Sequence, residues 1–117
     1  MADESLEHVL VEVATGLWRL QRRLDAVPQA QAAPETRAAA RQVRRILDVL
    51  GDADIRIDDH HGVLFDPGLA IDVVAYQPTE GVDRERVIET ERPSIYRGAA
   101  TLQRGRVIVG VPAGEST

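Results

Sequence analysis

Apolar residues recur at alternating intervals of four and three along the first quarter of the chain. The series begins at Leu6 and ends at Val27, and it predicts one helix over residues 3–27 with a heptad stripe. Acidic residues lie in its first turn and arginines in its later turns, an order that suits the helix dipole. Trp18 lies beside the stripe, and we expect its ring to pack in a core or an interface.

A second series of the same spacing follows a short linker, residues 28–34, that is bounded by prolines. It predicts a helix that starts near Pro34, runs to about Leu50 and takes Gly51 as its C-cap. Two heptad helices joined by a short loop are typical of an antiparallel hairpin.

In a two-helix hairpin, the apolar stripes of the two helices are buried on one side only. The other side needs a further partner to cover it. Stripes of this narrow kind pack helix on helix, so we expect two hairpins to form a dimerising four-helix bundle. The predicted dimer interface comprises Leu6, Leu10, Val13, Leu17, Leu20, Leu24, Val43, Ile46 and Leu50.

After Gly51 the segments become short, β-branched and interrupted by turn residues. They predict strands at 55–57, 70–76, 86–91, 95–97 and 106–111, with a loop at 78–83 and a hairpin turn at 97–100. The predicted fold class is therefore α+β. A helical hairpin at residues 1–51 precedes a small, mostly antiparallel β-domain at residues 52–117.

Composition narrows the classes of function. The absence of cysteine excludes a thiolate nucleophile and a Cys-ligated metal site. A net charge of −5 argues against non-specific binding to nucleic acid or to a membrane surface. The acidic start resembles no targeting signal, so we expect a cytoplasmic protein.

The run Asp58-Asp59-His60-His61 is the one cluster in the sequence that has the residue types of a metal site. Adjacent residues in an extended chain point to opposite faces, so the run favours a solvated turn closed by Gly62. His8 is expected to face solvent. No other arrangement predicts catalysis, and we expect no catalytic residues, no metal and no cofactor.

The segment Gly62–Leu69, with the sequence GVLFDPGL, has a turn chemistry of its own. Asp66 can accept backbone N–H bonds and Pro67 fixes its own φ, so a β-turn anchored by Phe65 is expected. An exposed corner of this kind is also a candidate docking point for a partner protein.

Residues 34–111 resemble the GrpE family, the nucleotide exchange factors of Hsp70-type chaperones. The matching stretches, in family order, are RRILDVLGDADIRI, GVLFDPGLAIDVV, PTEGV, the Ile95-Tyr96 pair and LQRGRVIVGV. The preceding helical hairpin is similar to the dimerising bundle of that family.

The resemblance implies a homodimeric co-chaperone that speeds ADP release from the nucleotide-binding domain of an Hsp70-type partner. It implies partner contacts at Phe65, Asp66, Pro67 and Arg97, whereas Leu69 and Tyr96 would support the domain from within. The alternative is a GrpE-like dimeric adaptor that has lost exchange activity.

Overall fold

A computed structural model describes residues 2–114 of the chain. The chain forms two compact units. The first comprises the residues up to Ile57 together with Tyr96–Leu102, and the second comprises Asp58–Ile95 together with the chain from Gln103 onward. Each unit is therefore built from two separate stretches of the chain, whereas each expected domain is one continuous stretch, with the boundary after residue 51. Each unit is described below by itself.

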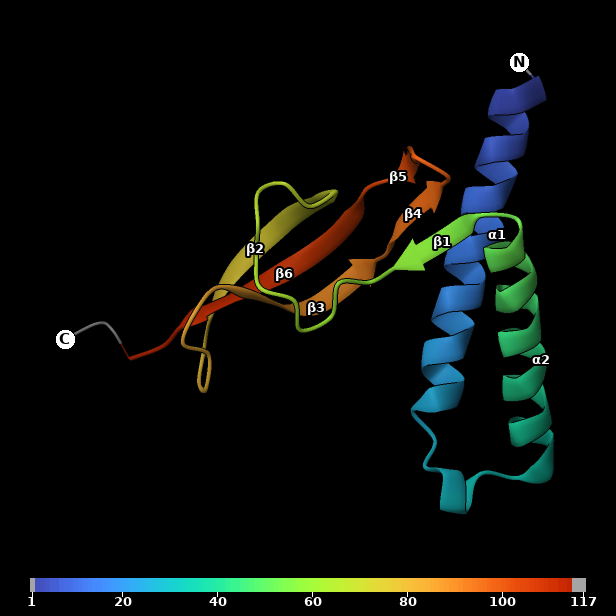
Figure 1. Cartoon of the computed structure of the whole chain (residues 1–117). Coiled ribbons are helices and arrows are strands. Elements are labelled where there is room, and N and C mark those ends of the chain that lie inside the picture. Colours follow the sequence, from blue (N-terminus) through green and yellow to red (C-terminus); the bar gives the residue numbers. More distant parts are fainter. Residues whose placement is uncertain (1, 115–117) are drawn as a thin grey trace. The chain divides into compact units, whose positions relative to one another are not determined.

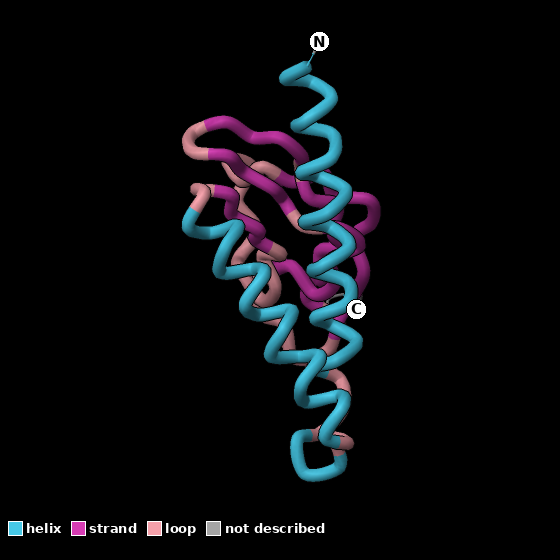
Figure 2. Tube along the Cα trace, turned by 90° about the vertical axis from the view of Figure 1, so that its right-hand side faces the viewer, coloured by secondary structure: helices cyan, strands magenta, loops and turns pink. Residues whose placement is uncertain are grey.

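The first unit is built on a helical hairpin. Helix α1 covers Ala2–Asp25, a short 3-10 helix η1 covers Gln29–Gln31, and α2 covers Pro34–Asp52. The two long helices run antiparallel and side by side in both views (Figures 1 and 2). Pro34 occupies the first turn of α2, where its missing N–H costs nothing. The predicted hairpin is confirmed, and neither helix in the described part of the chain is apolar enough to cross a membrane.

The C-terminal end of α2 corrects the prediction for Gly51. This glycine lies inside the helix, and Ala53 is the C-cap, with its N–H 3.0 Å from the Leu50 oxygen. Asp54 then turns the chain with a φ of 65°. Aspartate tolerates the left-handed conformation better than most residues, so the helix needs no glycine here.

The hairpin buries only part of its apolar surface. Ala14, Trp18 and Val43 are its buried apolar residues among those described, so Trp18 is packed as expected. The predicted stripe of α1 divides in two. Leu10, Leu17 and Leu24 are half-buried, whereas Leu6, Val13 and Leu20 are exposed.

Three short strands form one sheet. Strand β1 covers Ile55–Asp58, β4 covers Ser94–Arg97 and β5 covers Ala100–Gln103, in the order β1-β4-β5. Gly98 and Ala99 connect β4 to β5, which confirms the predicted hairpin turn. Gly98 has a φ of 58°, a conformation that glycine adopts without strain.

The second sheet has the order β2-β6-β3. Strand β2 covers Ile71–Thr79, β3 covers Arg86–Arg92 and β6 covers Gly105–Pro112. The central strand β6 is antiparallel to β3 and parallel to β2. The parallel pair makes this sheet mixed. The sequence predicted a mostly antiparallel domain and gave no sign of this parallel pair. The chain between β2 and β6 is long enough to return for parallel pairing.

The second unit has a compact apolar core on this sheet. Four buried aliphatic residues form the centre, and four partly buried residues pack against them. The centre is Ile71, Val87, Val107 and Val109, and the surrounding residues are Phe65, Leu69, Val73 and Val111. The fold as a whole is α+β, as predicted.

Candidate functional site

The segment that leads into the predicted corner is fastened to β3. Val87 donates its N–H to the Val63 oxygen at 2.9 Å, and Phe65 donates its N–H to the Glu85 oxygen at 2.9 Å. Gly62 donates its N–H to the Val87 oxygen at 3.0 Å. These bonds and an isolated antiparallel β-bridge between Leu64 and Arg86 hold residues 62–65 against the start of β3, so the corner starts from a fixed base.

The corner itself is a β-turn over Asp66–Leu69. Leu69 donates its N–H to the Asp66 backbone oxygen at 3.0 Å, and Gly68 donates its N–H to Asp66 Oδ1 at 2.8 Å. Pro67 occupies the second position of the turn, where its fixed φ suits the geometry. The predicted turn is confirmed, and Pro67 and Gly68 are exposed at its tip.

Phe65 joins the corner to the core. Its side chain is half-buried and packs against the buried aliphatic cluster. Its ring also meets that of Tyr76 edge to face, with 6.4 Å between the ring centroids. Phe65 is therefore an anchor of the turn that keeps part of its ring near the surface.

Tyr76 is a candidate that the sequence alone did not single out. It lies in β2, and its side chain is 55% exposed. The only sequence signal was an aromatic residue in a predicted strand, which is usually a packing residue. The second unit also exposes Val74 in β2, and Val63 and Leu64 in the segment that leads into the corner.

Arg97 and Tyr96 belong to the first unit, unlike the corner. Arg97 is exposed at the end of β4. Tyr96 is half-buried, and the guanidinium carbon of Arg56 lies 4.7 Å from the centroid of its ring. The structure thus groups Phe65, Asp66 and Pro67 at one corner of the second unit, whereas Arg97 belongs to the first unit.

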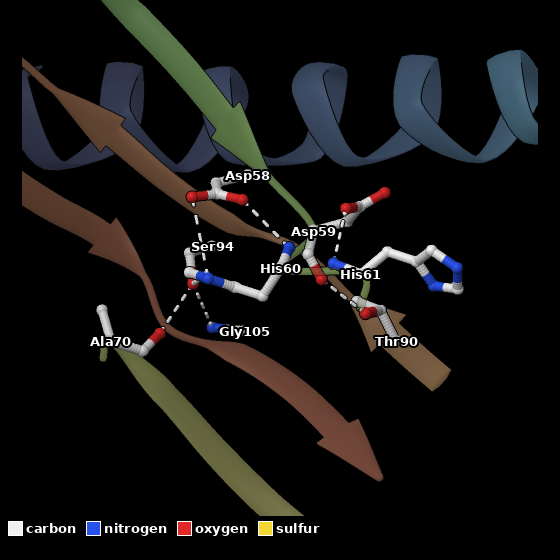
Figure 3. A network of polar contacts seen from close by, with 8 residues as sticks. All are labelled: Asp58, Asp59, His60, His61, Ala70, Thr90, Ser94 and Gly105. Carbon is white, nitrogen blue, oxygen red and sulfur yellow. Dashed lines mark hydrogen bonds and ion pairs between the residues drawn. The ribbon is translucent and has the colours of Figure 1, made fainter. Parts of the chain in front are cut away.

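The two adjacent histidines have opposite environments (Figure 3). His60 is 4% exposed, whereas His61 is exposed and points away from the network. The prediction of a solvated turn is therefore wrong for His60. Two short side-chain contacts shape the segment, because Asp58 Oδ1 accepts the His60 N–H at 2.9 Å and Asp59 Oδ1 accepts the His61 N–H at 3.0 Å.

The ring of His60 belongs to a buried polar network around Ser94. Ser94 Oγ lies 2.6 Å from the Ala70 oxygen, and only the hydroxyl has a proton to donate in that pair. Ser94 Oγ accepts the Gly105 N–H at 3.0 Å and lies 2.9 Å from His60 Nε2. Because the hydroxyl proton is already used, His60 Nε2 must be the donor in this contact.

Asp58, His60 and Ser94 have the residue types of an Asp–His–Ser catalytic triad, with His60 between the other two. Their geometry nevertheless indicates a structural role. The Ser94 side chain is fully buried and its proton points to a backbone carbonyl, so it cannot reach a substrate. His60 Nδ1 lies 3.6 Å from Asp58 Oδ2. The network ties the Asp58–His60 segment to the starts of β2, β4 and β6.

Gly105 is required at this junction. A Cβ at this position would lie 2.9 Å from Ser94 Oγ and 3.1 Å from the Ser94 nitrogen. Any side chain would therefore push β4 away and break the network. Among residues 2–114, no group of three or more His, Cys, Asp or Glu side chains gathers in a way that could hold a metal ion.

No family model matches the chain, and no curated protein matches it at a significant level.

Proposed function

We propose that this chain is a GrpE-like homodimeric exchange factor that promotes ADP release from an Hsp70-type chaperone ATPase. In this proposal the helical hairpins of two copies pair as a four-helix bundle. Each second unit then offers its corner at Phe65, Asp66 and Pro67 to the nucleotide-binding domain of the chaperone.

The observation that carries the proposal is the construction of that corner. Backbone bonds to β3 and the turn over Asp66–Leu69 hold Pro67 in an exposed position. A rigid apolar tip loses little conformational freedom on binding, and such anchors dominate the energy of protein interfaces. The sequence at this tip, Phe-Asp-Pro, is also one of the two moderately specific stretches of the family resemblance, together with the final strand.

The helical hairpin supports the dimeric part of the proposal. It exposes large apolar side chains on both helices, and soluble monomers seldom leave such a series uncovered. On α1 these are Leu6, Val9, Val13 and Leu20, and on α2 they are Ile46 and Val49. A second hairpin would cover them in the helix-on-helix packing that their spacing favours.

Exchange in this scheme needs no covalent chemistry. A ligand shifts a conformational equilibrium only by its difference in affinity for the two states. If the second unit binds the open nucleotide-binding domain more tightly than the closed one, the open state becomes more populated. The contacts that hold ADP are then broken more often, and ADP leaves faster.

The test is the release of a fluorescent ADP analogue from the Hsp70-type chaperones of the same organism. The full chain should accelerate release from one of them, and Pro67→Arg should abolish the acceleration while keeping the wild-type melting temperature. His61→Ala is the matched control, because His61 is also exposed in the second unit but lies outside the corner.

Two other outcomes separate the competing accounts. Binding to a chaperone without any change in release would identify the chain as an adaptor. Neither binding nor acceleration with any of these chaperones, at saturating concentrations of the chain, would contradict the proposal.

A further inference from the structure

One buried hydroxyl holds both ends of the segment that carries the corner, residues 60–70, which we call the corner loop. At the start of this loop, His60 Nε2 lies 2.9 Å from Ser94 Oγ. At its other end, the Ser94 hydroxyl donates to the Ala70 oxygen at 2.6 Å, as Figure 3 shows. The corner loop is therefore closed through a residue that is distant from it in the sequence.

Ser94 Oγ uses its full hydrogen-bonding capacity in this closure. A hydroxyl has one proton to donate and two lone pairs that accept. The proton goes to Ala70, and the lone pairs accept from His60 Nε2 and from the Gly105 N–H, which lies 3.0 Å away. The Gly105 N–H also lies 3.0 Å from the Ala70 oxygen. Because Ser94 is 0% exposed, solvent cannot take the place of these partners.

The backbone of His60 indicates that its side chain has a specific task. His60 has a φ of 58°, a left-handed conformation that glycine adopts more readily than other residues. Asp58 Oδ1 accepts the His60 N–H and so supports the turn, but this bond needs no imidazole. The contact with Ser94 Oγ, in contrast, requires a side chain with a donor that reaches β4. His60 thus combines a tight turn with a link to Ser94.

The two arms of the corner loop are fastened in different ways. The first arm, residues 62–65, is bonded to β3 along its length. In the part of the chain that the structure describes, the hydrogen bonds that join residues 66–70 to distant segments end on the Ala70 oxygen, and their donors are Ser94 and Gly105. Removing the Ser94 hydroxyl would leave this second arm with the Gly105 bond alone.

We propose that Ser94 is the positioning residue of the corner: it joins the two ends of the corner loop and so fixes the direction of the Pro67 tip before a partner binds. This inference rests on the proposed function, in which the tip contacts the chaperone. Ser94 is fully buried, so it acts through the loop and does not touch the partner. A tip that is already ordered loses less conformational freedom on binding, and the closure therefore raises affinity.

Amide hydrogen exchange tests the closure without a partner, at a temperature where each variant is folded. In Ser94→Ala the Gly68 and Leu69 amides should exchange about tenfold faster than in the wild type, because the loss of one arm lets the turn open locally. Ile95→Val is the matched control, since Ile95 is also fully buried in β4 and the change removes a methylene but no polar contact. It lowers stability in the same strand and should leave both corner amides at the wild-type rate.

His60→Asn is a second variant, which keeps the bond between Ser94 and Ala70. Asparagine tolerates the left-handed backbone at this position, but its shorter side chain cannot reach Ser94 Oγ. The corner amides of this variant should exchange faster than those of the wild type and more slowly than those of Ser94→Ala.

Release of a fluorescent ADP analogue from the chaperone gives a readout that a general loss of stability would not move. For Ser94→Ala, the concentration of the chain that gives half-maximal acceleration should rise about tenfold, because only affinity depends on the ordering of the tip. Acceleration at saturating concentrations should equal that of the wild type. Ile95→Val should match the wild type in both quantities.

Wild-type exchange of the Gly68 and Leu69 amides in Ser94→Ala, or equal acceleration of their exchange in Ile95→Val, would overturn the inference. If Ser94→Ala does not fold, His60→Asn decides in the same way. A wild-type half-maximal concentration for Ser94→Ala would also overturn the inference, while the proposed function would stand. A full chain that accelerates release from no chaperone would contradict the proposed function, and amide exchange alone would then decide whether Ser94 positions the corner.

Discussion

The two units of this chain treat their apolar residues in opposite ways. The second unit buries Ile71, Val87, Val107 and Val109 almost completely, and its exposed apolar residues fall in the segment before the corner and in β2. The helical hairpin buries one large side chain from each helix, Trp18 and Val43, and exposes a continuous stripe.

The second unit therefore has a core that one chain completes, whereas the hairpin has an apolar surface that one chain leaves exposed. The sheet of the second unit closes its core through contacts between distant segments. The hairpin, in contrast, has two helices and therefore one shared face, so the remaining apolar positions stay exposed. The mutations below should affect the two units in correspondingly different ways.

The largest effect is expected from Val107→Asp. Val107 is fully buried in the central strand β6, and a carboxylate there would have no partner. We expect the free energy of unfolding of the second unit to fall by about 4 kcal/mol or more. Hydrogen exchange of the β6 amides measures this, and protection equal to that of the wild type would contradict the assigned core.

Leu20→Asp should instead leave each chain folded and separate the two copies. Leu20 is exposed in one chain, so the charge is buried only in the dimer. The dimer buries this charge once in each copy, and a total penalty of about 3 kcal/mol would weaken self-association about 100-fold. The exposed variant His8→Asp introduces the same charge off the stripe and should associate like the wild type. Equal sedimentation of the two variants would contradict the assigned surface.

Ser94→Ala should cost about 2 kcal/mol of stability. His60 Nε2 would lose its acceptor, Ser94 Oγ, while it stays buried, and unsatisfied buried donors carry a penalty of this size. His61→Ala removes the exposed neighbour and should change stability by less than about 0.5 kcal/mol. Chemical unfolding of both variants checks the pair, and equal midpoints would show that the network contributes nothing.

The contrast between Ser94 and the helices shows what the sequence could predict. Apolar spacing is local, so it predicts both helices and the hairpin from the sequence alone. The His60–Ser94 contact joins residues 34 positions apart, and no short-range pattern reports such a pairing. The same limit applies to the parallel pairing of β2 with β6 and to the ring contact between Phe65 and Tyr76.

The corner lies between these cases. Its turn could be predicted because Asp66, Pro67 and Gly68 act on their own backbone. The attachment of residues 62–65 to β3 could not, since Val63 and Val87 are distant in the sequence. Heptad spacing likewise indicated an apolar stripe on α1, but it could not tell which of its residues face α2.

The smallest effect is expected from Gly16→Ala. Gly16 lies inside α1 with open space around it, so alanine should fit and should raise helix stability by about 1 kcal/mol. The measurement belongs in the Leu20→Asp background, where the chain is expected to be monomeric and only the single hairpin responds. A lower melting temperature would show that Gly16 is required within one chain.

One hairpin of this chain leaves large apolar side chains exposed, and we expect a second copy to cover them. Sedimentation equilibrium of the full chain over a wide concentration range measures whether the second copy binds. We expect a species of twice the chain mass of 12.8 kDa that dissociates on dilution. A single species of 12.8 kDa at every concentration, up to the highest that stays in solution, would contradict it.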